Sequence, residues 1–171
     1  MKIEQNIDLQ GELKITAKYK DGSEEVKYKK TKNLIVDSAK LAILRSLVGI
    51  SSSARGIDTL RVGTGGTVDP DGLYIKPVTG SQSSLFSQVE VSAGVPFELA
   101  LTAALDTTQF TVTFLGDLGF GDLNGMLLTE AALYQGNVAS GTTPTMFSIK
   151  VHPGIRKNSN FSLHYEWVIR V

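Results

Sequence analysis

Residues 33–49, NLIVDSAKLAILRSLVG, contain the two apolar patterns on which the fold prediction depends. The run Leu34–Val36 is short and continuous, as in a strand. Asp37 or Ser38 can then cap a helix, because a short side-chain oxygen accepts hydrogen bonds from the free N–H groups of a first turn. Beyond the cap, apolar residues recur at helical spacing and a glycine ends the pattern: Leu41, Leu44, Val48 and Gly49. We therefore predict one short α-helix over residues 38–48.

Outside this stretch the chain alternates with period two and breaks at Gly, Pro, Asn or Asp, which is typical of antiparallel strands joined by turns. The segments that predict strands after the helix are residues 57–65, 85–91, 95–103, 109–115, 127–134, 146–152 and 161–171. The fold class that follows is all-β, an antiparallel β-sandwich (jelly-roll-like) of about eight to ten strands with one short α-helix. We expect its core to contain Phe110, Phe114, Leu133, Phe147, Tyr165 and Trp167.

The bulk composition indicates a single soluble domain. The 171 residues are 42% apolar and 20% charged, and the formal net charge is zero. This balance disfavours binding to nucleic acid, which needs a basic surface. The chain has no cysteine, no apolar N-terminal run typical of a signal peptide and no apolar stretch long enough to span a bilayer. We expect one domain, 1–171, with an N-terminal arm and hairpin (1–31) and a sandwich core (32–171).

Residues 11–31 predict the first hairpin, with Asp21-Gly22 as a two-residue turn. In that register Ala17 lies opposite Val26 and Ile15 opposite Tyr28, so that apolar residues meet apolar residues. The outer face is rich in lysine, at Lys14, Lys18, Lys27 and Lys29. We expect these lysines to be solvated and to guard an edge strand. The alternative is a patch for an acidic partner.

Two short motifs resemble ligand sites but lack the residues that would complete them. The glycine run 63–66 has no following Lys-Ser/Thr and no helix, so a turn at a strand end is expected instead of a phosphate loop. Asp69-Pro70-Asp71-Gly72 lacks the later ligands of a calcium loop and predicts a turn. It lies in a long polar loop, 66–84, that also carries Leu73, Tyr74 and Ile75. Three bulky apolar side chains in such a loop indicate docking, onto this domain or onto a neighbour.

Glu130 is the one acidic residue placed inside an otherwise apolar strand. A buried carboxylate must be paired or hydrogen-bonded, so we expect a structural buried charge held by backbone N–H groups or by a cation, with Arg61 and Lys157 as the candidates. No second acid or base lies at a spacing that would make it catalytic. The two histidines, His152 and His164, lack the spacing of metal ligands. We therefore predict no catalytic residues, no metal and no cofactor.

Several segments, in this order, resemble the small structural proteins of tailed bacteriophages, found among tail, collar, fibre-attachment and head-decoration components. The resemblance extends from Asn33 to the C-terminus and is carried by Asn33–Ser38, Leu60–Gly65, Thr129–Tyr134, Met146-Phe147, Lys157, Phe161, Leu163 and Tyr165–Ile169. It implies a non-enzymatic virion protein, made in the host cytoplasm, that acts by assembly. The implied partners are further copies of itself, as a trimer or ring, and other virion proteins, without direct nucleic-acid binding or membrane insertion.

The apolar residues with no obvious place in a sandwich core are the expected interface. They lie in the N-terminal arm and the long loop, at Ile3, Ile7, Leu9, Leu73, Tyr74 and Ile75. An arm can pair with a neighbour's sheet edge through main-chain hydrogen bonds, and aromatic residues are common anchors. The alternative function is a carbohydrate- or receptor-binding β-sandwich module, for which Tyr74 would be the platform.

Overall fold

The structure, a computed structural model, describes residues 9–47, 56–136 and 143–170. Its elements are β1 (Gln10–Tyr19), β2 (Glu24–Ile35), α1 (Asp37–Leu47), β3 (Ile57–Gly63), β4 (Glu90–Ser92), β5 (Val95–Pro96), β6 (Glu98–Ala100), β7 (Thr102–Asp106), β8 (Thr111–Leu118), β9 (Leu127–Gln135), β10 (Thr145–Arg156) and β11 (Phe161–Arg170). The predicted all-β class with one short helix is confirmed within these ranges, and every strand pair is antiparallel.

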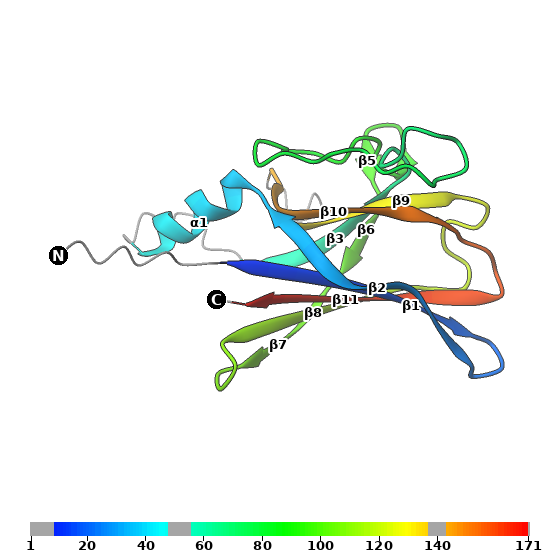
Figure 1. Cartoon of the computed structure of the whole chain (residues 1–171), viewed down its shortest axis with the longest axis horizontal. Helices are drawn as coiled ribbons and strands as arrows, with labels where there is room; N and C mark the ends of the chain where they lie inside the picture. The colour runs from blue at the N-terminus through cyan, green and yellow to red at the C-terminus, as the bar shows by residue number, and fades with distance from the viewer. Residues whose placement is uncertain (1–8, 48–55, 137–142, 171) are drawn as a thin grey trace.

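Nine strands form one sheet in the order β6-β3-β9-β10-β2-β1-β11-β8-β7, which folds over on itself (Figure 1). The fold occurs at β2, whose first part pairs with β1 and whose last residues, Leu34 and Ile35, pair with β10. At the opposite border the sheet nearly closes, because only Leu101 separates β6 in one layer from β7 in the other. The result is a sandwich whose two layers are joined by a strand that belongs to both.

The main core lies between the two layers. Many of its fully buried side chains come from strands β1, β3, β9 and β11, with Leu13, Ile15, Leu60, Leu133, Tyr165 and Trp167 all below 2% exposed. The predicted core residues Phe114, Leu133, Tyr165 and Trp167 are buried, and Phe147 is partly buried against them. Phe110 was wrongly predicted: it is 69% exposed with a φ of 50°. It belongs to the turn before β8, where a left-handed backbone turns the side chain out of the strand alternation.

The β1–β2 hairpin forms as predicted, but its register differs near the turn. The loop has three residues, closed by Gly22 at a φ of 86°, and Lys18 lies opposite Glu24. A three-residue loop shifts the pairing by one, so Val26 lies opposite Thr16 and is 48% exposed. A register shift between Ile15 and Thr16 then restores the predicted pair of Ile15 with Tyr28. Turn length, which the Asp-Gly pair alone does not fix, caused the error.

The lysine-rich face of this hairpin does not guard an edge, because β1 and β2 lie in the middle of the nine-stranded sheet. Three of its lysines instead form ion pairs with carboxylates of β2 and β11. Lys14 lies 3.9 Å from Glu166, Lys18 lies 4.0 Å from Glu24, and Lys27 lies 2.6 Å from Glu25. Such partly exposed pairs each stabilise little, so the face is a solvated surface of alternating charge.

The helix is confirmed within one residue of its predicted start, and Ser38 Oγ donates to the Met146 carbonyl 2.6 Å away, which ties α1 to β10. Leu41 on its predicted apolar face is 46% exposed, while the side chains of Leu44 and Val48 lie outside the described residues.

The predicted strand 85–91 is mostly loop, and 95–103 is broken among β5, β6 and β7. There the chain crosses between layers, which a single straight strand could not do.

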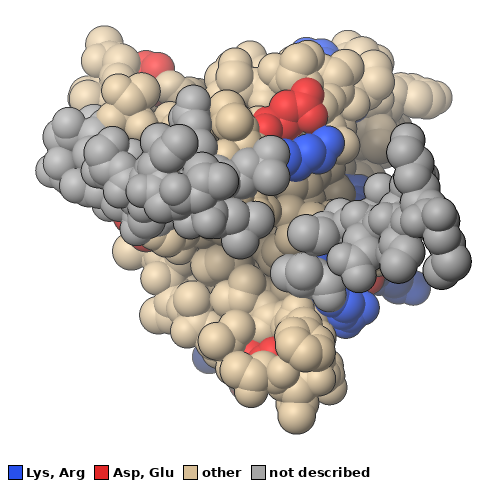
Figure 2. Space-filling model, turned by 90° about the vertical axis from the view of Figure 1, so that its left-hand side faces the viewer, with Lys and Arg blue, Asp and Glu red and all other residues tan. Residues whose placement is uncertain are grey.

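The outer border of the second layer is the β7–β8 hairpin, which lies at the lower left of Figure 1. Figure 2, which views this side of the molecule, shows few charged side chains in its lowest part. Its strand β7 is an edge strand without lysine or proline, the residues that usually protect an edge. The one charged side chain between Thr102 and Thr113, Asp106, accepts hydrogen bonds from the N–H groups of Thr108 and Gln109. This border therefore presents an almost uncharged surface.

The register correction makes a direct prediction about stability. Ile15→Ala should destabilise the protein by about 2–5 kcal/mol, because Ile15 is fully buried and truncation leaves a cavity. Val26→Ala should change the free energy of unfolding by less than about 0.5 kcal/mol, because its side chain is exposed. Denaturant unfolding of both variants measures this. A cost at Val26 comparable to that at Ile15 would contradict the three-residue turn.

Candidate functional site

A long segment, residues 64–89, connects β3 to β4 and carries the apolar triplet Leu73–Ile75. Within it, residues 67–75 fold into a small hairpin that we call the tip. Thr67 bridges to Ile75, and the Val68 N–H donates to the Tyr74 carbonyl over 2.9 Å. The Gly154 N–H of β10 donates to the Gly72 carbonyl over 2.6 Å and fastens the tip to the sheet. The tip is therefore a built feature.

Asp69 closes the tip in the way expected of a turn and not of a metal site. Its carboxylate accepts from the N–H groups of Leu73 (2.9 Å) and Tyr74 (2.6 Å), and these bonds lower the pKa of Asp69. Gly72, at a φ of 75°, supplies the left-handed position of the turn. The carboxylate thus holds the backbone of Leu73 and Tyr74, two of the three most exposed apolar residues of the segment.

Glu130 fixes the root of the same segment. It is fully buried in β9, and its carboxylate accepts from the N–H groups of Gly65 (3.1 Å), Phe86 (2.9 Å) and Ser87 (2.8 Å). These donors come from the beginning and the end of residues 64–89, so one side chain joins both ends of the segment. Glu130 is therefore buried and hydrogen-bonded by backbone N–H groups, one of the two arrangements expected from the sequence.

The glycine run 63–66 takes part in the same arrangement. Gly63 faces Glu130 across the strand pair, and a Cβ there would lie 2.4 Å from the Glu130 carboxylate. The Gly65 amide donates to Glu130, and the Gly66 amide donates to Thr129 Oγ1 over 2.8 Å. The amides that a phosphate loop would direct at a ligand are therefore used by internal acceptors. The expected turn at a strand end is confirmed.

Arg61 is buried, but its ion-pair partner is Glu98 of the neighbouring strand β6. Its Nη2 and Nε lie 2.7 and 3.1 Å from Glu98 Oε1, and its guanidinium lies 4.3 Å from the centre of the Tyr134 ring. Burial raises the pKa of the Tyr134 hydroxyl, and the nearby Arg61 charge opposes that shift. The pairing of Arg61 with Glu130 suggested by the sequence is replaced by this cross-strand ion pair.

Lys157 is fully buried at the other end of the sheet and serves a different loop. Its Nζ donates to the carbonyls of Phe120 (3.3 Å) and Asn158 (2.8 Å) and to Asn124 Oδ1 (3.1 Å). Burial lowers its pKa, and the charge of Asp122 opposes that shift. Lys157 therefore holds the turn before β9 and is not a partner of Glu130. Three buried charges were identified correctly from the sequence, but their pairing was not.

The two histidines lie apart and have separate surroundings. His152 is fully buried in β10, with its ring 5.5 Å from that of Tyr28, and Nδ1 donates to the Pro153 carbonyl over 2.8 Å. Burial is the main cause that lowers the pKa of His152 to about 4. His164, on the outer face of β11, lies 2.8 Å from Asp117. No cluster of three or more His, Cys, Asp or Glu that could hold a metal ion occurs among the described residues.

The residues of the expected interface are placed as follows. Leu73 is 67% exposed and Tyr74 69% exposed at the tip, and Ile75 is half exposed beside them. Leu9 is partly buried against the main core, and Ile3 and Ile7 lie outside the described residues. Val68 was missed, although it is 69% exposed on the same hairpin. Its exposure follows from the bridge between Thr67 and Ile75, which the sequence pattern does not reveal.

Comparison with known proteins adds no relative: no protein family, curated protein or solved structure matches this chain. In the described parts of the chain, no helix has the length and apolar character needed to cross a membrane.

Glu130 should be sensitive even to an isosteric change. Glu130→Gln replaces a carboxylate oxygen by an NH₂ group, which cannot accept from a backbone N–H, so one buried donor loses its acceptor. We expect a loss of about 1–3 kcal/mol in the free energy of unfolding and faster proteolysis within residues 64–89. The control is Glu24→Gln, an exposed carboxylate 4.0 Å from Lys18, which should change little. An unchanged midpoint for Glu130→Gln would show that the carboxylate does not support the segment.

The buried His152 predicts acid sensitivity. Because its pKa in the folded protein, about 4, lies below the ordinary value of 6.5, the unfolded chain binds the proton more readily. Its contribution to stability is fully present above pH 6.5, falls as the pH drops, and is lost below about pH 4. The total effect is about 3 kcal/mol. Unfolding of His152→Gln between pH 7 and 4 should show a smaller pH-dependent loss, whereas His164→Gln should retain it.

Proposed function

We propose that this chain is a non-enzymatic structural protein of a tailed-phage virion, a tail, collar or capsid-decoration component. In this proposal it self-assembles into a trimer or ring and docks to other virion proteins. The resemblance in the sequence supplies the virion context. The observation that carries the assembly function is the tip, an exposed apolar surface on a backbone that is already fixed.

The tip combines the two properties that a docking surface needs. Val68, Leu73 and Tyr74 each leave about two thirds of the side chain exposed, which is uncommon for neighbouring apolar residues on a monomer surface. The carboxylate of Asp69 and the bond from Gly154 already order the backbone beneath them. Binding there costs little additional conformational entropy, which favours affinity.

The charge balance is consistent with contacts of this kind. With 17 basic and 17 acidic residues, the chain has no net charge to repel further copies or to steer a charged partner. Contacts between copies then depend on apolar and backbone groups, with local ion pairs setting the register.

One observation favours the alternative of a carbohydrate- or receptor-binding module. Tyr74 is a largely exposed aromatic side chain, and aromatic faces stack on sugars as readily as on protein. The carboxylate of Asp69, which accepts from the Tyr74 N–H, has its oxygens engaged by backbone N–H groups, so it offers a sugar fewer acceptors than a free acid would. Binding of the protein to a glycan array, lost in Tyr74→Ser, would favour this alternative.

The assembly function predicts a mass that depends on the tip. Light scattering coupled to size-exclusion chromatography should give an oligomer for the wild type and a smaller mass for Leu73→Ser combined with Tyr74→Ser. The variant should remain folded, because both side chains are exposed. Val91→Ser, which removes a 63% exposed apolar side chain from β4, is the control and should leave the mass unchanged. A wild-type monomer at high concentration would contradict self-assembly.

A further inference from the structure

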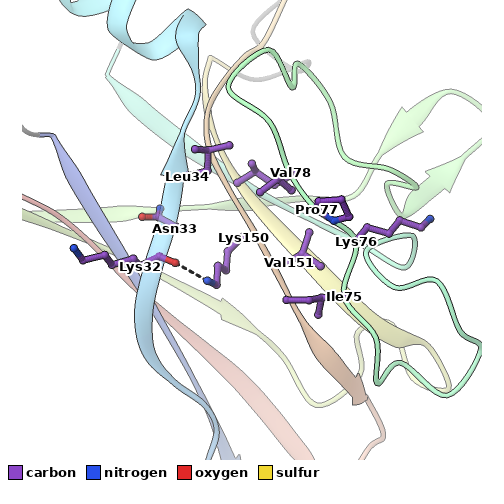
Figure 3. Close-up of a pocket in the computed structure, with 10 residues that line it drawn as sticks. Lys32, Asn33, Leu34, Ile75, Lys76, Pro77, Val78, Lys150 and Val151 are labelled. Atoms are coloured by element: carbon purple, nitrogen blue, oxygen red, sulfur yellow. Dashed lines mark hydrogen bonds between the residues drawn. The ribbon is translucent and has the colours of Figure 1, made fainter.

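A groove of about 310 Å³ lies between the end of the tip and the place where β2 passes from β1 to β10 (Figure 3). Three segments line it: residues 32–34 of β2, residues 149–151 of β10 and residues 75–78 after the tip. The side chains of Leu34, Ile75, Pro77, Val78 and Val151 gather around it, while those of Lys32 and Lys76 extend to opposite sides. It is an apolar channel with a charged rim.

The groove exists because β2 leaves β10 after two residue pairs. Leu34 pairs with Ile149 and Ile35 with Ser148, but Asn33 and Lys32, the next residues in that register, turn away to pair with β1. The Lys150 ammonium spans the gap and donates to the Lys32 carbonyl. The Lys150 side chain thus occupies part of the space that a longer β2–β10 pairing would fill. Beyond it, β2 and β10 are not paired.

The rim has one sign of charge. Lys32, Lys76 and Lys150 line the groove, and none of the described Asp and Glu residues does so. In a chain whose total charge is zero, this is a local excess of three cations beside apolar side chains. A complementary occupant is an extended segment that presents apolar side chains on one face and carboxylates on the other.

We propose that this groove receives residues 3–8 of the N-terminal arm of a second copy of the chain. In an extended conformation Ile3, Gln5 and Ile7 fall on one face, and Glu4, Asn6 and Asp8 fall on the other. Residues 3–8 contain two carboxylates and no lysine or arginine. Ile3 and Ile7 fill the apolar channel, and Glu4 and Asp8 pair with the lysines of the rim. This inference rests on the proposed assembly function and identifies its contact.

The direction of the chain favours a neighbour's arm over the chain's own. In the antiparallel β1–β2 pair, Gly11 lies opposite Asn33 and Glu12 opposite Lys32. Followed backward from Gly11 to Leu9, the chain therefore runs toward Ile35 and away from Lys32. In addition β1 lies on one side of β2, whereas β10 and the groove lie on the other. The chain's own arm would have to reverse direction and cross β2, but an arm from a second copy meets neither constraint.

The size of the groove also matches a short segment. Pockets that enclose small organic ligands have volumes of about 300–1,000 Å³ and bury most of the ligand. This groove is at the lower end of that range and is open along its length, with Ile75 half exposed at its wall. Two aliphatic side chains from a passing strand fill such a space better than an enclosed ligand does.

The test is a charge exchange between two full-length variants. The first variant, Lys32→Glu with Lys76→Glu, reverses the rim and keeps the acidic arm. The second, Glu4→Lys with Asp8→Lys, reverses the arm and keeps the basic rim. Each alone should assemble with an apparent dissociation constant raised about tenfold or more, because attraction is replaced by repulsion. An equimolar mixture should regain assembly, since each arm then finds a groove of opposite charge.

Light scattering of each variant, of the mixture and of the wild type measures this. The control is Lys20→Glu with Lys29→Glu, which makes the same charge change at two exposed lysines of the hairpin and should assemble like the wild type. A mixture that assembles no better than the separate variants would overturn the inference. Wild-type mass in both separate variants would also overturn it and leave assembly through another surface intact. A monomeric wild type would contradict the inference and the proposed function together.

Discussion

The membership of β2 in both layers is the constraint on which the rest of the structure depends. A strand that pairs with β1 along most of its length and with β10 at its end must bend between them. That bend folds the nine strands into a sandwich, encloses the core between β1, β11, β9 and β3, and forces β2 and β10 apart beyond Leu34. The groove is the space left by this separation. A single backbone feature therefore creates both the core and the open groove beside the tip.

The long segment of residues 64–89 must also be held in place, although it contains no strand of the main sheet. Residues 64–89 have few ladder hydrogen bonds, so their N–H groups need other acceptors. Glu130 provides acceptors for both ends of the segment, Thr129 for Gly66 and Asp69 for the tip. A small second core that includes Leu85, Ala132 and Tyr134 fills the space beneath. Side-chain carboxylate and hydroxyl groups thus accept here the hydrogen bonds that strand pairing provides elsewhere in the sheet.

The sequence was sufficient for the features that depend on local pattern. The alternation from Phe161 to Ile169 identified β11 and its buried face, and the capped apolar period identified α1. It was also sufficient to mark Glu130, Arg61 and Lys157 as buried charges. Their partners depend on which strands become neighbours, and Glu98 meets Arg61 only because β6 pairs with β3. The exposure of Phe110 and Val26 depends on turn geometry, and the groove depends on the bend in β2. None of these has a local signature.

The ten residue pairs between β1 and β11 have a mechanical consequence. Gln10 pairs with Arg170, so the start of β1, the first described strand, lies beside the end of β11, the last one. A force that pulls these two ends apart loads the ladder at one end and opens its pairs one after another. A force between Gln10 of β1 and Phe161 at the opposite end of β11 acts along the strands and loads all ten pairs in shear at the same time, so many hydrogen bonds must break together. The domain should therefore yield easily to a force in one direction and resist strongly a force in another.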